Sequence, residues 1–464
     1  MYRDLLEEEP LPSKSSGFRL VGTWWPKDRP DAQQPGQLEC IRDKGSILEV
    51  LNGLGKEGLD YVPLVHGKTI QAEQVTACGC SSVGFATSYE RGRYKSAYTV
   101  ELLVLGGHYP ERDRILFREI TVDYSSLWHW VGAQLFETPA LWPSSSLDAP
   151  WTVTVHPLRN IELFSGPSYR LLLNYGGNIR TTGDNWTFCL KPYAHVQCVF
   201  HKPASFDQYL PIIKSFRDFL TFATLRATGV DKITAPLPTP AMFQGDRACL
   251  YHRDLLASAV ADSINNPLFR VADTAGCQVL LNNWFTKAEK LQPAVDWYLL
   301  TRYTPRMHED IAFLCLVHAI EAYHRRNKAN EKIPAEEHQR RLAAVKASAP
   351  QEHRRWLLSK LAYSNEPSLR NRLEALLHEL GPIVSNFTIP EQFIEDVVTK
   401  RNYLVHSPPE RADKVLKKET YRLSESIEFL LGACILTELG MGAQAVTSVL
   451  HKAHTLLRKR YGRD

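Results

Sequence analysis

The pattern of apolar residues changes along this chain from a strand-like repeat to a helix-like repeat. Residues 98–105 and 169–173 are rich in β-branched, aromatic and leucine side chains, and glycine pairs follow these runs. Beyond about residue 278, apolar residues recur at helical spacing instead. The pattern predicts an α+β chain in two parts, with a β-rich N-terminal domain that resembles a sandwich or barrel, followed by an all-α helix bundle.

We place the two domains at residues 1–265 and 278–461. The first contains one predicted helix, at about residues 206–226, and a predicted break at three closely spaced prolines, Pro236, Pro238 and Pro240. Short Gly, Pro or Asn breaks separate most of the helices predicted in the second domain, which are 311–325, 336–347, 354–362, 368–380, 389–406, 419–439 and 443–459.

Composition excludes several classes of protein. Hydrophobic residues make up 44% of the 464 residues and charged residues 23%, as in ordinary globular proteins. No apolar run approaches the roughly 20 residues that cross a bilayer, and residues 1–9 are too acidic for a secretory signal. The odd number of cysteines, nine, fits reduced thiols. We therefore expect a cytoplasmic protein that does not enter a membrane.

The net charge of +4 is unevenly distributed. Residues 1–300 carry 29 Lys and Arg against 31 Asp and Glu, whereas residues 301–464 carry 26 against 20. A basic half can bind an acidic polymer such as RNA, although solvated helical surfaces are also often basic. Charge by itself makes RNA a candidate partner and no more.

The segment RNYLVH, residues 401–406, combines two side chains suited to phosphodiester chemistry. Arg401 offers a planar fork of donors that matches phosphate oxygens, and His406 belongs to the residue type that exchanges protons near neutral pH. Similar Arg and His spacings occur elsewhere in the chain without an Asn after the Arg. Spacing alone is therefore equally compatible with a solvated helix face.

The flanking sequence places this segment at the end of a helix. Thr388 and Glu391 form a predicted capping box at the start, and Ser407, which precedes two prolines, is disfavoured in a helix. Arg401 and His406 are then five positions apart, or about 140° around an ideal helix. They can meet at one phosphate only if the last turn bends or a second chain contributes.

A zinc site is the main alternative chemistry in the N-terminal half. Its candidate ligands are Cys189, His195, Cys198 and His201. Residues 187–200 alternate as in a strand, which directs these side chains to both faces. We therefore expect strand residues here and no metal site. The chain also lacks the P-loop, G-x-S-x-G and H-E-x-x-H motifs.

Two parts of the sequence resemble ApeA-type anti-phage proteins. The R-N-x-x-x-H segment and the helix 311–325, IAFLCLVHAIEAYHR, are similar to the HEPN domains of that family. In the N-terminal half, GTWWP at 22–26, PGQL at 35–38, GSILEV at 45–50 and HGK at 66–68 resemble the start of the ApeA N-terminal domain. Trp24 and Trp25 are expected to pack against the sheet.

The resemblance implies a metal-independent endoribonuclease, without cofactor, that causes abortive infection after sensing an unknown phage-derived trigger. RNA would be the substrate, with tRNA as one candidate, and a homodimer or higher homo-oligomer would form the active site. Arg401, Asn402 and His406 would be catalytic, and Glu321 would support Arg401. Two alternatives stay open: a non-catalytic HEPN-like module that binds RNA, nucleotide or protein, and a toxin paired with a separate nucleotidyltransferase antitoxin.

Overall fold

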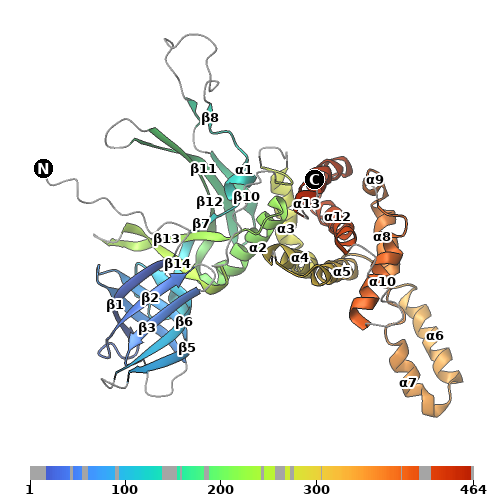
Figure 1. The fold of residues 1–464 in the computed structure, drawn as a ribbon, viewed down its shortest axis with the longest axis horizontal. Helices are drawn as coiled ribbons and strands as arrows, with labels where there is room; N and C mark the ends of the chain where they lie inside the picture. Colours follow the sequence, from blue (N-terminus) through green and yellow to red (C-terminus); the bar gives the residue numbers. More distant parts are fainter. Residues whose placement is uncertain are drawn as a thin grey trace, which may run out of the picture. The chain divides into compact units, whose positions relative to one another are not determined.

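The computed structural model describes residues 17–41, 45–54, 61–88, 93–137, 154–156, 159–181, 188–241, 245–255, 267–271, 276–304, 306–387, 389–406 and 420–460. The chain divides into two compact units, Met1–Gln278 and Val279–Asp464. The N-terminal unit contains the β-strands and the C-terminal unit is helical (Figure 1). The two-part α+β architecture expected from the sequence is confirmed.

Strands of the N-terminal unit close into an antiparallel barrel. The order is β6-β3-β2-β1-β4-β5, and β5 pairs back onto β6. Their bounds are β1 (Phe18–Pro26), β2 (Gln34–Ile41), β3 (Gly45–Leu51), β4 (Tyr61–Thr69), β5 (Gln74–Ser88) and β6 (Arg93–Leu105). Trp24 is fully buried in the barrel core and lies against Gly67, where an added Cβ would be 2.3 Å from the indole ring. The expected packing of Trp24 is confirmed.

The barrel continues into an open antiparallel sheet, because β14 also pairs with β6. The order from that edge is β14-β13-β7-β12-β11-β10. The strands are β7 (Leu116–Tyr124), β10 (Arg159–Ser165), β11 (Tyr169–Thr181), β12 (Phe188–Ser205), β13 (Val230–Ala241) and β14 (Gly245–His252). Smaller elements are η1 (Arg112–Arg114), α1 (Leu127–Val131), β8 (Phe136–Glu137), β9 (Thr154–Val155) and η2 (Arg253–Leu255).

Helix α2 (Phe206–Thr224) packs on this open sheet and confirms the helix predicted there. The Tyr209 hydroxyl donates to the carbonyl oxygen of Phe117 at 2.9 Å. The predicted break at Pro236, Pro238 and Pro240 is wrong, since β13 runs to Ala241. The prolines have no N–H to donate, and the pairing of β13 with β14 is irregular between Pro236 and Ala241. The prolines therefore disturb the ladder without ending the strand.

The helices of the second half follow the predicted series closely. They are α3 (Cys277–Thr286), α4 (Ala288–Tyr303), α5 (Glu309–Asn327), α6 (Ala335–Ser348), α7 (Gln351–Leu361), α8 (Leu369–Glu379), α9 (Gly381–Val384), α10 (Phe393–His406), α12 (Thr420–Glu438) and α13 (Ala443–Arg460). Helix α10 begins at Phe393 and not at residue 389, because the Phe393 amide closes a turn on the Pro390 carbonyl at 2.9 Å. Thr388, the predicted cap, lies outside the described residues.

Helices α4, α5 and α12 form the centre of the C-terminal unit. Phe313, Leu316 and Ile320 of α5 are fully buried there. Arg302 of α4 donates to Glu428 of α12 at 2.8 Å, and both side chains are at most 2% exposed. This buried ion pair fixes how α4 faces α12. None of the described helices is both long and apolar enough to cross a bilayer.

Candidate functional site

Helix α10 carries the R-N-x-x-x-H segment and presents one face to the bundle. Phe393, Val397 and Lys400 are buried at the spacing i, i+4, i+7, which is one stripe of a helix. An ideal helix then places Arg401 beside this stripe and His406 on the opposite side. The observed burial agrees, since Arg401 and Asn402 are half-buried and His406 is exposed. Within one chain, the arginine and the histidine therefore point in different directions.

Arg401 and Asn402 contact one another directly. The Arg401 Nη1 donates to the Asn402 Oδ1 at 3.3 Å. His406 makes no hydrogen bond or ion pair with any other residue in the described part of the chain. The resemblance implies that Asn402 is catalytic. In this structure its amide oxygen faces the arginine, and the imidazole of His406 is accessible to a bound molecule.

A charged anchor holds α10 on the bundle just before Arg401. Lys400 is only 5% exposed, and its ammonium nitrogen lies 3.0 Å from the Asp310 Oδ1 at the start of α5. The same carboxylate accepts from the Thr420 hydroxyl at 3.2 Å, at the start of α12. Three helices thus meet at Asp310. Sequence analysis missed this anchor, although Lys400 falls on the apolar stripe and a buried ammonium requires a carboxylate.

Glu321, the predicted support for Arg401, faces other groups. Its carboxylate lies 3.9 Å from the His318 imidazole one turn earlier in α5. Burial and the Arg325 charge lower the pKa of Arg372, and the Glu321 carboxylate partly opposes this shift, so Glu321 lies near that guanidinium. No hydrogen bond or ion pair joins Glu321 to Arg401, both of which are described residues. A supporting role would require Glu321 to act through α5 as a whole.

A second arginine and histidine pair lies inside the bundle. Arg372 of α8 donates through Nη1 to the His324 Nδ1 at 2.9 Å and through Nη2 to the Asn330 Oδ1 at 2.7 Å. Arg372 is 2% exposed and His324 is 4% exposed. Burial, followed by the adjacent Arg372 charge, lowers the pKa of His324 to about 4. His324 is therefore neutral at physiological pH and accepts a hydrogen bond, which is a structural arrangement.

The zinc ligands considered from sequence are dispersed along β12. Cys198 is buried, whereas Cys189 and His201 are exposed. His195 stacks on Tyr193 with ring centroids 6.0 Å apart. Across the described residues, no group of three His, Cys, Asp or Glu side chains is placed to hold a metal ion.

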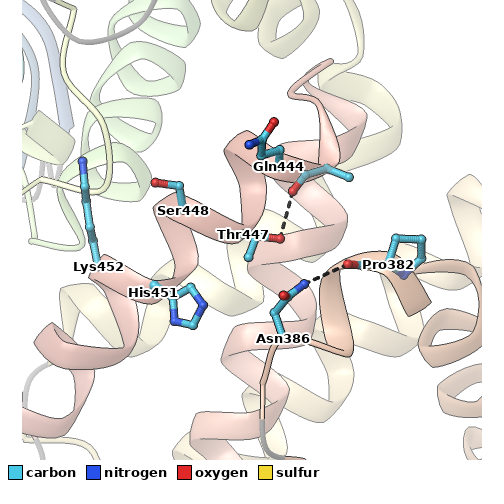
Figure 2. Close-up of a pocket in the computed structure, with 8 residues that line it drawn as sticks. Pro382, Asn386, Gln444, Thr447, Ser448, His451 and Lys452 are labelled. Carbon is cyan, nitrogen blue, oxygen red and sulfur yellow. Dashed lines mark hydrogen bonds between the residues drawn. The ribbon is translucent and has the colours of Figure 1, made fainter.

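An open groove of about 690 Å³ lies between α9 and α13 (Figure 2). Asn386 follows α9 and donates to the Pro382 carbonyl at 3.0 Å, while His451 of α13 stacks on Phe387 with centroids 4.3 Å apart. The groove is open, and none of the R-N-x-x-x-H residues lines it. The exposed His406 and the groove are therefore separate features of the C-terminal unit.

Comparison with known protein families adds two matches. The family model described as ApeA N-terminal domain 1 matches residues 19–240, and the model described as Apea-like HEPN matches residues 314–444. The second range includes Glu321, Arg401, Asn402 and His406. No curated protein and no solved structure matches the chain significantly.

Proposed function

We propose that this chain, which has the architecture of an ApeA-type anti-phage HEPN protein, is a metal-independent endoribonuclease that acts through Arg401, Asn402 and His406. The observation that carries the proposal is α10 itself. This helix holds a half-buried arginine bonded to Asn402 and, in its last turn, an exposed histidine that makes no bond to a described residue. Phage infection would activate the enzyme, and RNA cleavage would stop growth of the infected cell.

RNA supplies its own nucleophile, so the protein has only to move protons and stabilise charge. The 2′-oxygen attacks phosphorus, the bond to the 5′-oxygen breaks, and the products are a 2′,3′-cyclic phosphate and a free 5′-hydroxyl. One base accepts the 2′-proton and one acid protonates the leaving 5′-oxygen. We assign proton transfer to His406 and stabilisation of the phosphate charge to Arg401. Asn402 orients the guanidinium through its 3.3 Å contact.

The geometry of α10 favours an active site shared by two copies of the chain. Each α10 has one arginine beside the bundle and one histidine on the far side, about 140° away on an ideal helix. A twofold axis through this region would supply two histidines, one for each proton transfer. Val405, beside His406, is 48% exposed and gives the face an apolar contact for a second copy. A homodimer is therefore the proposed active form.

The test is cleavage of RNA, with tRNA among the substrates offered, by wild type, His406→Ala, Arg401→Ala and a mixture of the two variants. We expect the cleavage rate of each variant alone to fall by a factor of about 10²–10⁴, which is the usual contribution of a proton-transfer group. A mixed dimer keeps Arg401 in one copy and His406 in the other, so the mixture should recover part of the activity. Cleavage should persist in a chelator.

Four outcomes would count against this proposal or parts of it. His406→Ala that cleaves RNA as fast as wild type would remove the catalytic assignment. A mixture as inactive as its components would show that one Arg401 and one His406 from different copies do not make an active site. Activity lost in chelator and restored by divalent ions would contradict metal independence. Wild-type protein that binds RNA yet cleaves none would favour the alternative of a non-catalytic binding module.

A further inference from the structure

Helices α6 and α7 form a hairpin that is inserted between α5 and α8 and buries almost nothing. Neither helix contains a fully buried residue. Figure 1 shows the hairpin extending beyond the other helices of the C-terminal unit. A helix pair held mainly by tertiary packing would show a buried apolar stripe. A hairpin this exposed contributes little to the core, and its surface is open to a binding partner.

The base of the hairpin is nevertheless fixed. The Asn365 side chain accepts from the Ile333 amide at 3.1 Å and donates to the Ile333 carbonyl at 2.9 Å. The Lys332 amide donates to the Asn365 carbonyl at 2.8 Å. The His338 imidazole lies 2.9 Å from the Ser364 hydroxyl. These bonds tie the two ends of the hairpin together, so it extends from the bundle in a defined direction.

Aromatic and cationic side chains alternate in sequence along α7 and the turn that follows it. Trp356 and Lys360 are one turn apart on α7, and Tyr363 lies two residues beyond the end of that helix at Leu361. Trp356 is 61% exposed and Tyr363 is 77% exposed, and both are among the exposed large hydrophobic side chains of the chain. Two exposed aromatic rings this near in sequence offer a surface that a partner can cover.

The charges around these two rings are positive and mostly unpaired. Residues 335–363 contain six Lys and Arg against three Asp and Glu. Arg341 pairs with Glu337, and Arg354 donates to the Ala349 carbonyl at 2.9 Å. The remaining four cations have no carboxylate partner within the described ranges: Arg340, Lys346, Arg355 and Lys360.

We propose that the α6–α7 hairpin is an arm that binds single-stranded RNA, with bases stacked on Trp356 and Tyr363 and phosphates held by Arg355 and Lys360. Flat aromatic rings accept any base, and cations between them match the phosphates of the backbone. A protein partner would match a large apolar patch better than two rings separated by a lysine. The inference rests on the proposed ribonuclease function, because the arm would deliver substrate to α10 in the same unit.

The test separates RNA binding from RNA cleavage. Full-length protein carrying His406→Ala is titrated with a fluorescein-labelled oligouridine. We expect Trp356→Ala to weaken binding about tenfold and Trp356→Ala with Tyr363→Ala about a hundredfold, since each ring loses a stacked base. Trp356→Phe should retain most of the affinity, and Trp356→Leu should not. Arg355→Gln and Lys360→Gln should each reduce the slope of log affinity against log salt by about 0.7.

Lys290→Glu is the matched control, because Lys290 is an exposed lysine on α4 of the same unit. Its effect on binding should be less than twofold. Binding that is unchanged in the Trp356 and Tyr363 variants would overturn the arm, and so would equal losses in the Lys290 variant. If those variants bind normally while His406→Ala still abolishes cleavage, the arm fails and the ribonuclease proposal stands. If the wild type cleaves no RNA but the Trp356 and Tyr363 variants lose RNA binding, the RNA-binding arm stands and the ribonuclease proposal fails.

Discussion

The C-terminal unit contains two arginine and histidine pairs that differ in almost every physical respect. Arg372 and His324 come from separate helices, are at most 4% exposed, and share a 2.9 Å hydrogen bond. Arg401 and His406 come from the same helix and make no bond to each other. Arg401 is half-buried and His406 is exposed. The same two residue types thus serve as an internal brace in one place and, in the proposed active site, as groups open to a ligand in the other.

Burial decides which role each pair can take. A buried imidazole that accepts from a guanidinium is held neutral and cannot exchange a proton with a substrate. An exposed imidazole in the last turn of a helix can. The comparison teaches that an arginine and a histidine in the same unit can act on a ligand only where the histidine is exposed.

The largest effect is expected at the buried pair. Arg372→Ala removes the donor of both the His324 Nδ1 and the Asn330 Oδ1 contacts, and it leaves the first acceptor buried and the second partly buried. We expect the free energy of unfolding to fall by about 3 kcal/mol, the range for a broken buried polar network. Urea denaturation of the variant measures it. The rate of cleavage per folded molecule should stay at the wild-type level.

Arg401→Ala is the matched change at the exposed pair. It should lower the cleavage rate and leave the stability of the fold almost unchanged. Its free energy of unfolding should move by less than about 0.5 kcal/mol. Equal stability losses in the two variants would show that Arg401 is a structural residue too, and the contrast between the pairs would disappear.

Periodicity made the helices of the C-terminal unit predictable. The separation of Arg401 and His406 by about 140° follows from the helical repeat, and the burial of Phe393 and Val397 agrees with that repeat. The α10 start was missed by four residues because local turn chemistry at Pro390 competes with helix propensity. Local sequence therefore predicts which way α10 faces better than it predicts where α10 begins.

Contacts between distant segments could not be predicted in the same way. The His324–Arg372 bond joins residues 48 positions apart, and the Lys400–Asp310 ion pair joins two helices. In the N-terminal unit, alternation predicts strands, but the return of β5 to β6 that closes the barrel depends on the pairing of whole strands. A single sequence carries no local signal for either kind of contact.

The second effect is a pH dependence of stability that arises from the buried pair. The pKa of His324 is lowered to about 4 by burial and by Arg372 and Lys328, against the opposing charge of Glu379. A histidine in the unfolded chain has a pKa of about 6.5. Between these values the unfolded chain binds a proton that the folded protein does not. Acidification through this window therefore destabilises the fold.

We expect about 2 kcal/mol of stability from this source to be lost between pH 7.5 and pH 5. Urea denaturation at both pH values measures the loss. His324→Gln should be less stable at pH 7.5 but should lose correspondingly less on acidification, because it has no imidazole to protonate. A decline of the same size in the variant and the wild type would show that other groups cause it.

The smallest effect concerns Asn402, which contacts Arg401 at 3.3 Å from a half-buried position. Asn402→Ala should change the free energy of unfolding by less than about 0.5 kcal/mol. If Asn402 acts by holding the Arg401 guanidinium, the cleavage rate should fall about fivefold, because the guanidinium is no longer fixed in one orientation. The same substitution made on top of Arg401→Ala should then cause no further loss, since the group that it orients is already absent. A full additional fivefold loss in the double variant would mean that Asn402 contacts the RNA or His406 independently of Arg401.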